Sequence, residues 1–249
     1  MSFHPDWVVP DWPAPANVKA LITTRAGGTS SGAFASLNLG FRTGDDPQAV
    51  AANRARLRAE LPQEPTWLRQ VHGARVADAD SVTTVPEADA SFARTPGTVC
   101  VVLIADCVPV LMTDRAGSVV AIAHAGWRGL AGGVIENTVS ALALDPAELL
   151  AYLGPAIGPR AFEVGADVRE AFLAHDSQAA AAFAPRLPGK WLADLFLLAR
   201  QRLQRAGVRS IHGGGLCTYS EPARFFSYRR ERATGRMAAL IWREECTGS

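Results

Sequence analysis

The sequence predicts a single α+β domain over residues 1–249, built from mixed sheets with helices outside them. Two observations lead to this prediction. Short apolar runs bounded by turn residues are typical of hairpin strands, and stretches of helical periodicity separate other runs as crossover connections. The composition agrees, because 249 residues that are 48% hydrophobic can bury a sizeable core.

The N-terminal part begins with an apolar strand and continues into a helix. Val18–Thr23 has the pattern of the strand, and a Gly/Ser-rich loop follows it. Asp46 followed by Pro47 is a strong helix start, because Asp caps the first turn and Pro suits the first helical position. Trp67–Val76 then alternates like a strand with a break, and His72 lies at that break.

The pattern at the centre of the chain predicts three buried strands in succession, of which the last two can pair as a hairpin. Apolar runs at Val99–Ala105, Val108–Met112 and Val119–Ala123 have the length and the β-branched content of strands. If the last two pair as a hairpin, Cys107 at the start of one lies beside His124 at the end of the other. A thiol and an imidazole are therefore expected together at one edge of a buried sheet.

The C-terminal part alternates predicted strands and helices, which supports the mixed architecture. A helical pattern follows Gly126, so the backbone N–H groups of its first turn form an anion site. Gly207 closes the last predicted helix. The helix after Gly126 carries Leu130, Val134, Ile135 and Val139 as its apolar positions. The other predicted helices are Val168–Phe183 and Leu192–Ala206, and the predicted strands are Leu149–Leu153, Val208–Ile211, Phe225–Tyr228 and Met237–Trp242.

Charge and cysteine usage restrict the partners and the compartment. The formal net charge is +1, which gives little attraction for nucleic acid or anionic lipid. No apolar run approaches the roughly 20 residues of a membrane span, and the N-terminal residues lack a signal-peptide pattern. None of the cysteines forms a CxxC pair, so we expect free thiols and a cytoplasmic location. We also expect a monomer or a weak homo-oligomer. The cysteines are Cys100, Cys107, Cys217 and Cys246.

Three side chains match the ligand set of a catalytic zinc site. His72, Cys107 and His124 give a Cys/His₂ set in which a fourth position stays open for water or substrate. His212 and Cys217 remain candidates for a fourth ligand. The pair of Cys107 and His124 also suits a cysteine nucleophile with its base, so both interpretations stay open.

Eight stretches together resemble the YfiH-type family, whose members are described as multicopper polyphenol oxidases and as purine nucleoside phosphorylases. The resemblance runs through nearly the whole chain, and its Ala-Asp-Cys-x-Pro and His-Ala-Gly-Trp-Arg-Gly stretches are specific signatures. The family often has Tyr at the position of Phe162. The stretches are Thr23–Gly28, Ser36–Gly40, Asn53–Arg54, Gln70–Gly73, Ala105–Val110, His124–Gly129, Gly154–Gly158 and Thr234–Arg236.

The resemblance implies zinc bound by His72, Cys107 and His124, and an α/β fold with two sheets between helices. It also implies phosphorolysis of adenosine, inosine, guanosine and methylthioadenosine to the free base and ribose 1-phosphate, and deamination of adenosine. Purine nucleosides and phosphate are then the expected partners.

Phosphorolysis needs a phosphate-binding position and stabilisation of charge as the glycosidic bond breaks. Arg128 at the predicted helix start is a candidate catalytic residue. Arg25 and Arg42 flank glycine-containing loops that can reach the same site, although a single arginine is more often a solvated surface residue. Asn38 is a candidate contact to the base or ribose, and Trp127 is a candidate for stacking on a purine.

Two carboxylates are candidate catalytic residues for proton transfer. Asp106 lies next to Cys107, and Glu163 lies in the stretch that follows Phe162. Asp106 equally suits a residue that caps the turn after a strand. The zinc-deaminase signature H-x-E with P-C-x-x-C is missing, so deamination would need a different arrangement.

Three other functions stay open. A cysteine hydrolase that cleaves amide bonds in cell-wall precursors would use Cys107 as nucleophile and His124 as base. A copper-dependent polyphenol oxidase fits less well, because multicopper sites use H-x-H pairs and this chain has five histidines and no such pair. A single Cys/His₂ site can still take Cu²⁺ in vitro, because copper outcompetes zinc for such ligands. The third is a metal-binding regulator without enzymatic activity.

Overall fold

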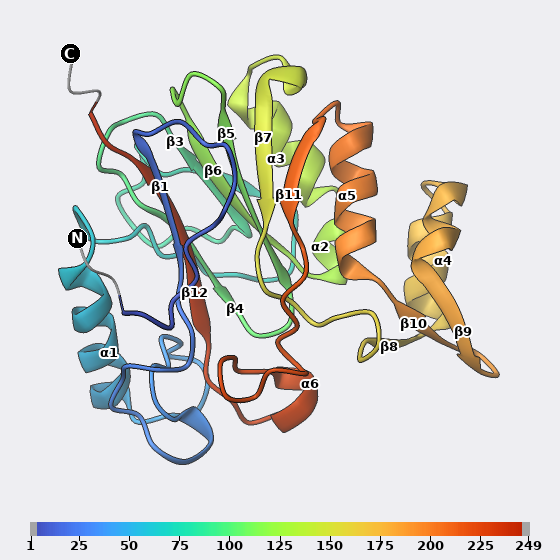
Figure 1. Ribbon diagram of the computed structural model, residues 1–249, viewed down its shortest axis with the longest axis horizontal. Helices are drawn as coiled ribbons and strands as arrows, with labels where there is room; N and C mark the ends of the chain where they lie inside the picture. Colours follow the sequence, from blue (N-terminus) through green and yellow to red (C-terminus); the bar gives the residue numbers. More distant parts are fainter. Residues whose placement is uncertain (1–3, 246–249) are drawn as a thin grey trace.

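The computed structural model describes residues 4–245, and its largest element is a mixed sheet of six strands (Figure 1). Pairing is antiparallel in the middle of this sheet and parallel at its two edges. The strand order is β11-β7-β5-β6-β3-β2. The bounds are β2 Val76–Asp78, β3 Ala90–Ala93, β5 Val108–Asp114, β6 Val120–Ala125, β7 Leu149–Leu153 and β11 Ser210–Gly213.

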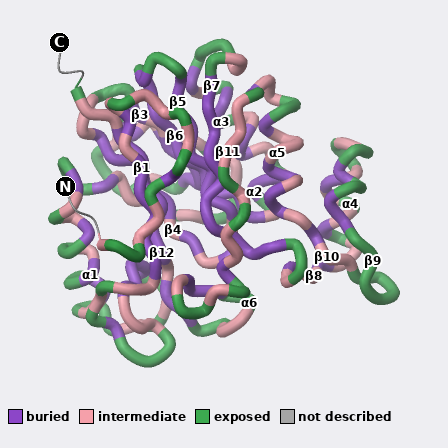
Figure 2. Tube along the Cα trace, viewed as in Figure 1, coloured by how far each residue is buried: buried purple, intermediate pink, exposed green. Residues whose placement is uncertain are grey.

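The hairpin predicted at the centre of the chain forms the middle of this sheet. β5 and β6 pair antiparallel, with Val108 opposite Ala125 and Pro109 opposite His124. Every residue of both strands is buried, as continuous apolar runs predict, and Figure 2 shows this central layer as buried chain. The hairpin prediction is therefore confirmed, and its register brings Cys107 close to His124.

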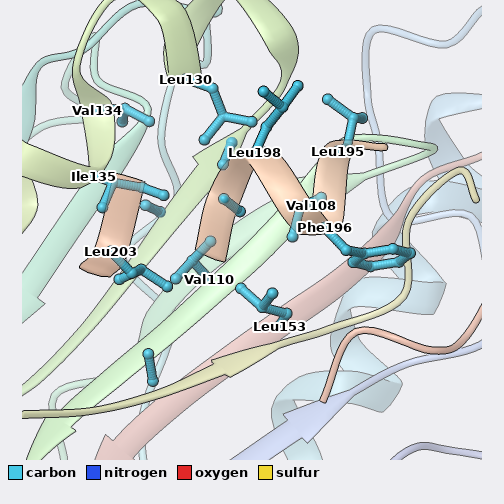
Figure 3. Close-up of a cluster of buried hydrophobic side chains, with 14 of the residues drawn as sticks. Val108, Val110, Leu130, Val134, Ile135, Leu153, Leu195, Phe196, Leu198 and Leu203 are labelled. Carbon is cyan, nitrogen blue, oxygen red and sulfur yellow. The ribbon is translucent and has the colours of Figure 1, made fainter. Parts of the chain in front are cut away.

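Helices cover one face of the six-stranded sheet. Leu130 and Ile135 from the helices pack with Val110 of β5 in a large apolar cluster (Figure 3). The single helix predicted after Gly126 is divided in two at Gly133, whose φ of +91° suits glycine. The helices of this layer are α2 Trp127–Ala131, α3 Val134–Leu142 and α5 Leu195–Arg205.

A second, antiparallel sheet covers the opposite face. Ile22 and Ile241 of this sheet join Leu111 and Ile122 of the hairpin in a second apolar cluster. The other face of the second sheet packs against α1, whose first turn is capped by Asp46 as predicted. The strand order is β1-β12-β4, with bounds β1 Val18–Ile22, β4 Cys100–Ile104, β12 Met237–Arg243 and α1 Pro47–Ala59.

A third, small sheet lies to one side of these layers (Figure 1). The α+β class is confirmed, but residues 4–245 form three sheets and not the two that the resemblance implies. The helix predicted over Val168–Phe183 ends at Leu173, because Asp176 caps a separate 3₁₀ helix that leads into a strand. The elements are β8 Glu163–Gly165, α4 Ala166–Leu173, the 3₁₀ helix Ser177–Ala182, β9 Phe183–Leu187 and β10 Lys190–Ala193.

The strand predicted over Trp67–Val76 is wrong for most of its length. The backbone N–H groups of residues 71–73 donate to the carboxylate of Asp89, so this segment is a turn and cannot form a strand ladder. A regular strand begins only at Val76.

The strand predicted over Phe225–Tyr228 is also wrong. Phe225 and Phe226 are fully buried in a loop, so their apolar character reflects core packing and not sheet pairing. No described helix is long enough and apolar enough to cross a membrane. The remaining helices are α6 Tyr228–Glu231 and the 3₁₀ helices Gly32–Phe34 and Pro146–Glu148.

Candidate functional site

Three side chains with soft ligand atoms converge where the central hairpin meets the loop before β2. Cys107 directly precedes β5, His124 lies near the end of β6, and His72 comes from the loop. Their ligand atoms all lie within 4.8 Å of one another. The centroids of the two imidazole rings are 4.9 Å apart. These three residues are called the Cys/His₂ cluster below.

The backbone after His124 leaves space for this cluster. Gly126 has an ordinary φ of −72° at the start of α2. A Cβ atom at this position would lie 2.7 Å from the Sγ atom of Cys107 and 3.2 Å from Cδ2 of His72. The absence of a side chain at Gly126 therefore allows close approach of the ligands and is not needed for backbone freedom.

Asp89, directly before β3, is a site residue that the sequence analysis missed. It is 0% exposed. Its Oδ1 accepts hydrogen bonds from His124 Nδ1 and from the backbone N–H of His72, both at 2.9 Å. Its Oδ2 accepts from the backbone N–H of Val71 at 3.1 Å and of Gly73 at 2.7 Å. No local pattern marks this residue, because the pairing of β3 with β6 brings the partners together.

Burial and neighbouring charges set the ionisation of the cluster. Burial disfavours the charged forms of Cys107 and His124, but the attraction between thiolate and imidazolium outweighs it. The pKa of Cys107 is therefore lowered and the pKa of His124 is raised. Burial raises the pKa of Asp89, but hydrogen bonds from His124 and Gly73 lower it to a net value below the usual range. Asp89 is thus a carboxylate, which only accepts hydrogen bonds.

The cluster lies in the wall of a cavity of about 800 Å³, a volume typical of small-molecule sites. Among the described residues that line it, one is a carboxylate, Asp106, and six are arginines, so the walls favour anions. Aromatic rings, including Trp127 and Phe162, add flat apolar surface. The arginines are Arg42, Arg54, Arg69, Arg128, Arg229 and Arg236.

Arg54 and Arg236 are cavity residues to which the sequence analysis gave no role. The guanidinium carbon of Arg54 lies 3.5 Å from the ring centroid of Trp67 and 4.5 Å from that of Phe41. Burial lowers the pKa of Arg54 to about 10, although the negative charge of Glu64 acts to raise it. Burial also lowers the pKa of Arg236. Both groups are charged at neutral pH, and partial burial strengthens their attraction for an anion.

Residues 19–244 match the family model described as multi-copper polyphenol oxidoreductase laccase, which covers most of the chain. The chain belongs to this family. The family resemblance drawn from the eight stretches is confirmed, because a YfiH protein is among the close relatives.

The relatives match over nearly their full length. A protein of Pseudomonas aeruginosa named purine nucleoside phosphorylase is 55% identical, covering 96% of this chain and 99% of the relative. Purine nucleoside phosphorylase YfiH of Escherichia coli is 56% identical, covering 94% and 98%. The crystal structure of a Neisseria meningitidis protein of family DUF152 has a TM-score of 0.94 at 53% identity, covering 96% and 100%. YlmD from Geobacillus stearothermophilus has a TM-score of 0.86 at 35% identity, covering 92% and 93%.

Four further site residues predicted from the sequence line the cavity. Arg128 stacks on the ring of Trp127, with 4.4 Å between guanidinium carbon and ring centroid. Both carboxylate oxygens of Asp106 are occupied, since Thr218 Oγ1 donates to Oδ1 at 2.6 Å and Arg229 N to Oδ2 at 2.7 Å. Asp106 therefore holds α6 and the loop that carries Thr218 close to the start of β5. The four residues are Arg42, Asp106, Trp127 and Arg128.

Arg25 and Asn38, the other two predicted substrate contacts, are not among the described residues that line the cavity. The guanidinium of Arg25 donates to the carbonyl groups of Ala35 at 2.8 Å and Pro222 at 2.9 Å, so it joins two loops. Asn38 is fully buried, and its Oδ1 accepts from the backbone N–H of Arg236 at 2.9 Å. Asn38 therefore fixes the backbone of Arg236, which lines the cavity.

Glu163 and the candidate fourth ligands also lie apart from the cluster. Glu163 pairs with Arg186 at 3.2 Å on the third sheet and does not line the cavity. Within residues 4–245 the group of possible metal ligands holds neither His212 nor Cys217. Cys217 lines a second cavity. Free thiols are confirmed for Cys100, Cys107 and Cys217, and Cys246 lies outside the described residues.

Proposed function

We propose that this protein is a zinc-dependent purine nucleoside phosphorylase. It would cleave adenosine, inosine, guanosine and methylthioadenosine with phosphate to the free base and ribose 1-phosphate. The observation that carries the proposal is the position of the Cys/His₂ cluster in the wall of an arginine-lined cavity. The names of relatives that match nearly the whole chain support it.

The donor set fits zinc. Two imidazoles and a thiolate are typical ligands of catalytic zinc, and they leave one position for substrate or water. His72, Cys107 and His124 would hold the ion, which when bound would act as a Lewis acid toward a substrate atom. The same donors can bind Cu²⁺, so the metal present in the purified protein is part of the test.

The cavity walls supply binding and charge stabilisation. Phosphate would form charge-assisted hydrogen bonds with guanidinium groups, for which Arg54, Arg128 and Arg236 are the candidates. Trp127 offers a flat ring for stacking on the purine. As the glycosidic bond breaks, its electrons move to the departing base, and the fixed positive charges stabilise that base.

Adenosine deamination is a second activity within this proposal. It needs a carboxyl group that shuttles protons at the purine. Asp106 is the carboxylate at the described cavity wall, and both of its oxygens already accept hydrogen bonds. Glu163 is paired outside the cavity. We therefore expect phosphorolysis to be faster than deamination.

Metal content and turnover measured on the same samples test the proposal. Wild type, His72→Ala, Cys107→Ala and His124→Ala are purified without added metal and analysed by elemental mass spectrometry. We expect about one zinc per wild-type chain, and its loss together with a decrease of about 100-fold or more in phosphate-dependent adenine release in each variant. Cys217→Ala, which removes a thiol outside the cluster, is the control, and we expect it to keep both the zinc and the adenine release. Metal-free wild type, or adenine release that does not need phosphate, contradicts the proposal.

One observation favours a second function, a cysteine hydrolase acting on amide bonds. Cys107, His124 and Asp89 follow the order nucleophile, base and orienting carboxylate, with His124 Nδ1 at 2.9 Å from Asp89 Oδ1. The two functions differ in the state of Cys107. An alkylatable Cys107 in the metal-loaded protein, with hydrolysis of an amide substrate, supports the hydrolase and not the phosphorylase.

A further inference from the structure

Asp89 forms hydrogen bonds with both histidines of the Cys/His₂ cluster. Its carboxylate accepts from His124 Nδ1 and from the backbone of His72, and its carbonyl oxygen accepts the backbone N–H of His124 at 2.7 Å. We propose that Asp89 is the positioning residue of the metal centre, which selects the nitrogen of His124 that faces the site and shapes the turn that presents His72. This inference rests on the metal site of the proposed function.

The selection of the nitrogen follows from hydrogen-bond chemistry. A carboxylate has no proton to donate, so the hydrogen between Asp89 Oδ1 and His124 Nδ1 belongs to the imidazole. Nε2 is then the nitrogen that can release its proton and offer a lone pair to a metal. Asp89 is 0% and His124 is 4% exposed, so water does not compete for this contact.

The same carboxylate shapes the turn at His72. His72 has φ of +61°, a conformation that is costly for a residue with a side chain and persists where its surroundings impose it. Three consecutive backbone N–H groups, of residues 71–73, donate to Asp89. Such a run of N–H groups forms a concave anion site, here filled by a side chain of the protein itself.

Asp89→Asn changes the acceptor capacity of this side chain without changing its size. A carboxylate has about four acceptor positions, and four donors use them in this structure. An amide has one oxygen, so its NH₂ group must face at least one of these donors. Where it faces His124, it donates to Nδ1, and the ring proton moves to Nε2, which then cannot bind a metal.

Asp114 at the far end of β5 provides a matched control. It is 5% exposed and also holds a turn, since its carboxylate accepts from Ser118 N at 2.7 Å, Ser118 Oγ at 2.7 Å and Val119 N at 3.2 Å. These partners lie between β5 and β6, away from the cluster. Asp114→Asn therefore removes the same kind of buried acceptor without altering the ligands.

The experiment measures zinc affinity and the ring proton of His124. Zinc Kd comes from competition with a chromophoric chelator, and ¹⁵N–¹H NMR detects the ring N–H, assigned by its absence from His124→Ala. We expect a slowly exchanging Nδ1–H in wild type. In Asp89→Asn we expect its loss and a zinc Kd raised about 10- to 100-fold, with Asp114→Asn within about threefold of wild type.

Two results overturn the inference. One is a zinc Kd for Asp89→Asn within about threefold of wild type, and the other is an equal loss in Asp114→Asn. If Asp89→Asn does not fold, the wild-type spectrum decides, because a His124 that lacks Nδ1–H contradicts the inference and one that carries it supports the inference. Neither measurement uses turnover, so the two proposals can fail separately. If wild type binds zinc but does not catalyse phosphorolysis, only the proposed function is refuted. If wild type is purified without metal, its NMR spectrum still shows whether Nδ1 of His124 carries the proton.

Discussion

The three described cysteines carry the same side chain in three different electrostatic environments. Cys100 is fully buried in β4, and burial raises the pKa of its thiol to about 12. The pKa of Cys107 is lowered despite burial, because the charge of His124 stabilises its thiolate. Partial burial opposes ionisation of Cys217, but hydrogen bonds from Ser220 hold its pKa below the ordinary value. Residue type alone therefore does not indicate which thiol reacts.

At the residue scale we predict the order of thiol alkylation in the zinc-loaded protein. Because the thiolate is the reactive form, Cys217 should react with iodoacetamide at pH 7 at least about tenfold faster than Cys100. Raising the pH should accelerate Cys217 only until its thiolate is fully formed, which occurs at lower pH than for a free thiol. Peptide mass spectrometry over time measures both rates, and denatured protein, where every thiol reacts, is the control. Equal rates in folded protein contradict the prediction.

At the scale of single elements, the site is built from one hairpin and the loops at its end. The hairpin of β5 and β6 was predictable, because its apolar runs and its turn are local signals. The turn at His72 was not, because its hydrogen bonds go to Asp89, which is distant in sequence. Sequence alternation in Trp67–Val76 therefore suggested a strand where a buried carboxylate imposes a turn.

The cavity wall also contains residues whose role could be predicted from the sequence and residues whose role could not. His72, Cys107 and His124 were found from ligand chemistry, which a sequence displays directly. The role of Arg54 depends on its position beside Trp67 and Phe41, which only the packed structure reveals. The third sheet was missed because its strands are short and β9 is mostly exposed, so they carry little apolar periodicity.

At the start of α2 we predict that Gly126→Ala weakens zinc binding. The new methyl carbon would lie 2.7 Å from Cys107 Sγ, so the sulfur must move, and overpacking of this kind costs about 1–3 kcal/mol of folding free energy. We expect zinc Kd to rise at least about tenfold, as when support for a ligand is lost. Chelator competition measures it. Gly215→Ala is the control, because nothing lies within 4 Å of a Cβ there. Equal Kd values for both variants and wild type contradict the prediction.

At the scale of the whole molecule, the layers share the central hairpin. The inner faces of β5 and β6 pack under the helices, and their opposite faces pack on the second sheet. We propose that residues 1–249 unfold as one unit, because neither apolar cluster is complete without these two strands. The Cys/His₂ cluster adds a link between the hairpin and the loop that carries His72.

Zinc should therefore stabilise the whole fold. An ion that binds only the folded chain adds about 4 kcal/mol at a free concentration of 1,000 times its Kd, which for a chain of this size raises Tm by about 10 °C. Differential scanning calorimetry of wild type with zinc and after EDTA treatment measures the shift. Cys107→Ala, which lacks the thiolate ligand, should show one transition that does not respond to EDTA. A wild-type Tm unchanged by EDTA contradicts the metal linkage. Two separate transitions in the calorimetric scan would contradict the proposal that the chain unfolds as one unit. Zinc bound by the Cys/His₂ cluster can stabilise the hairpin and the loop of His72 together only if the two unfold in the same transition.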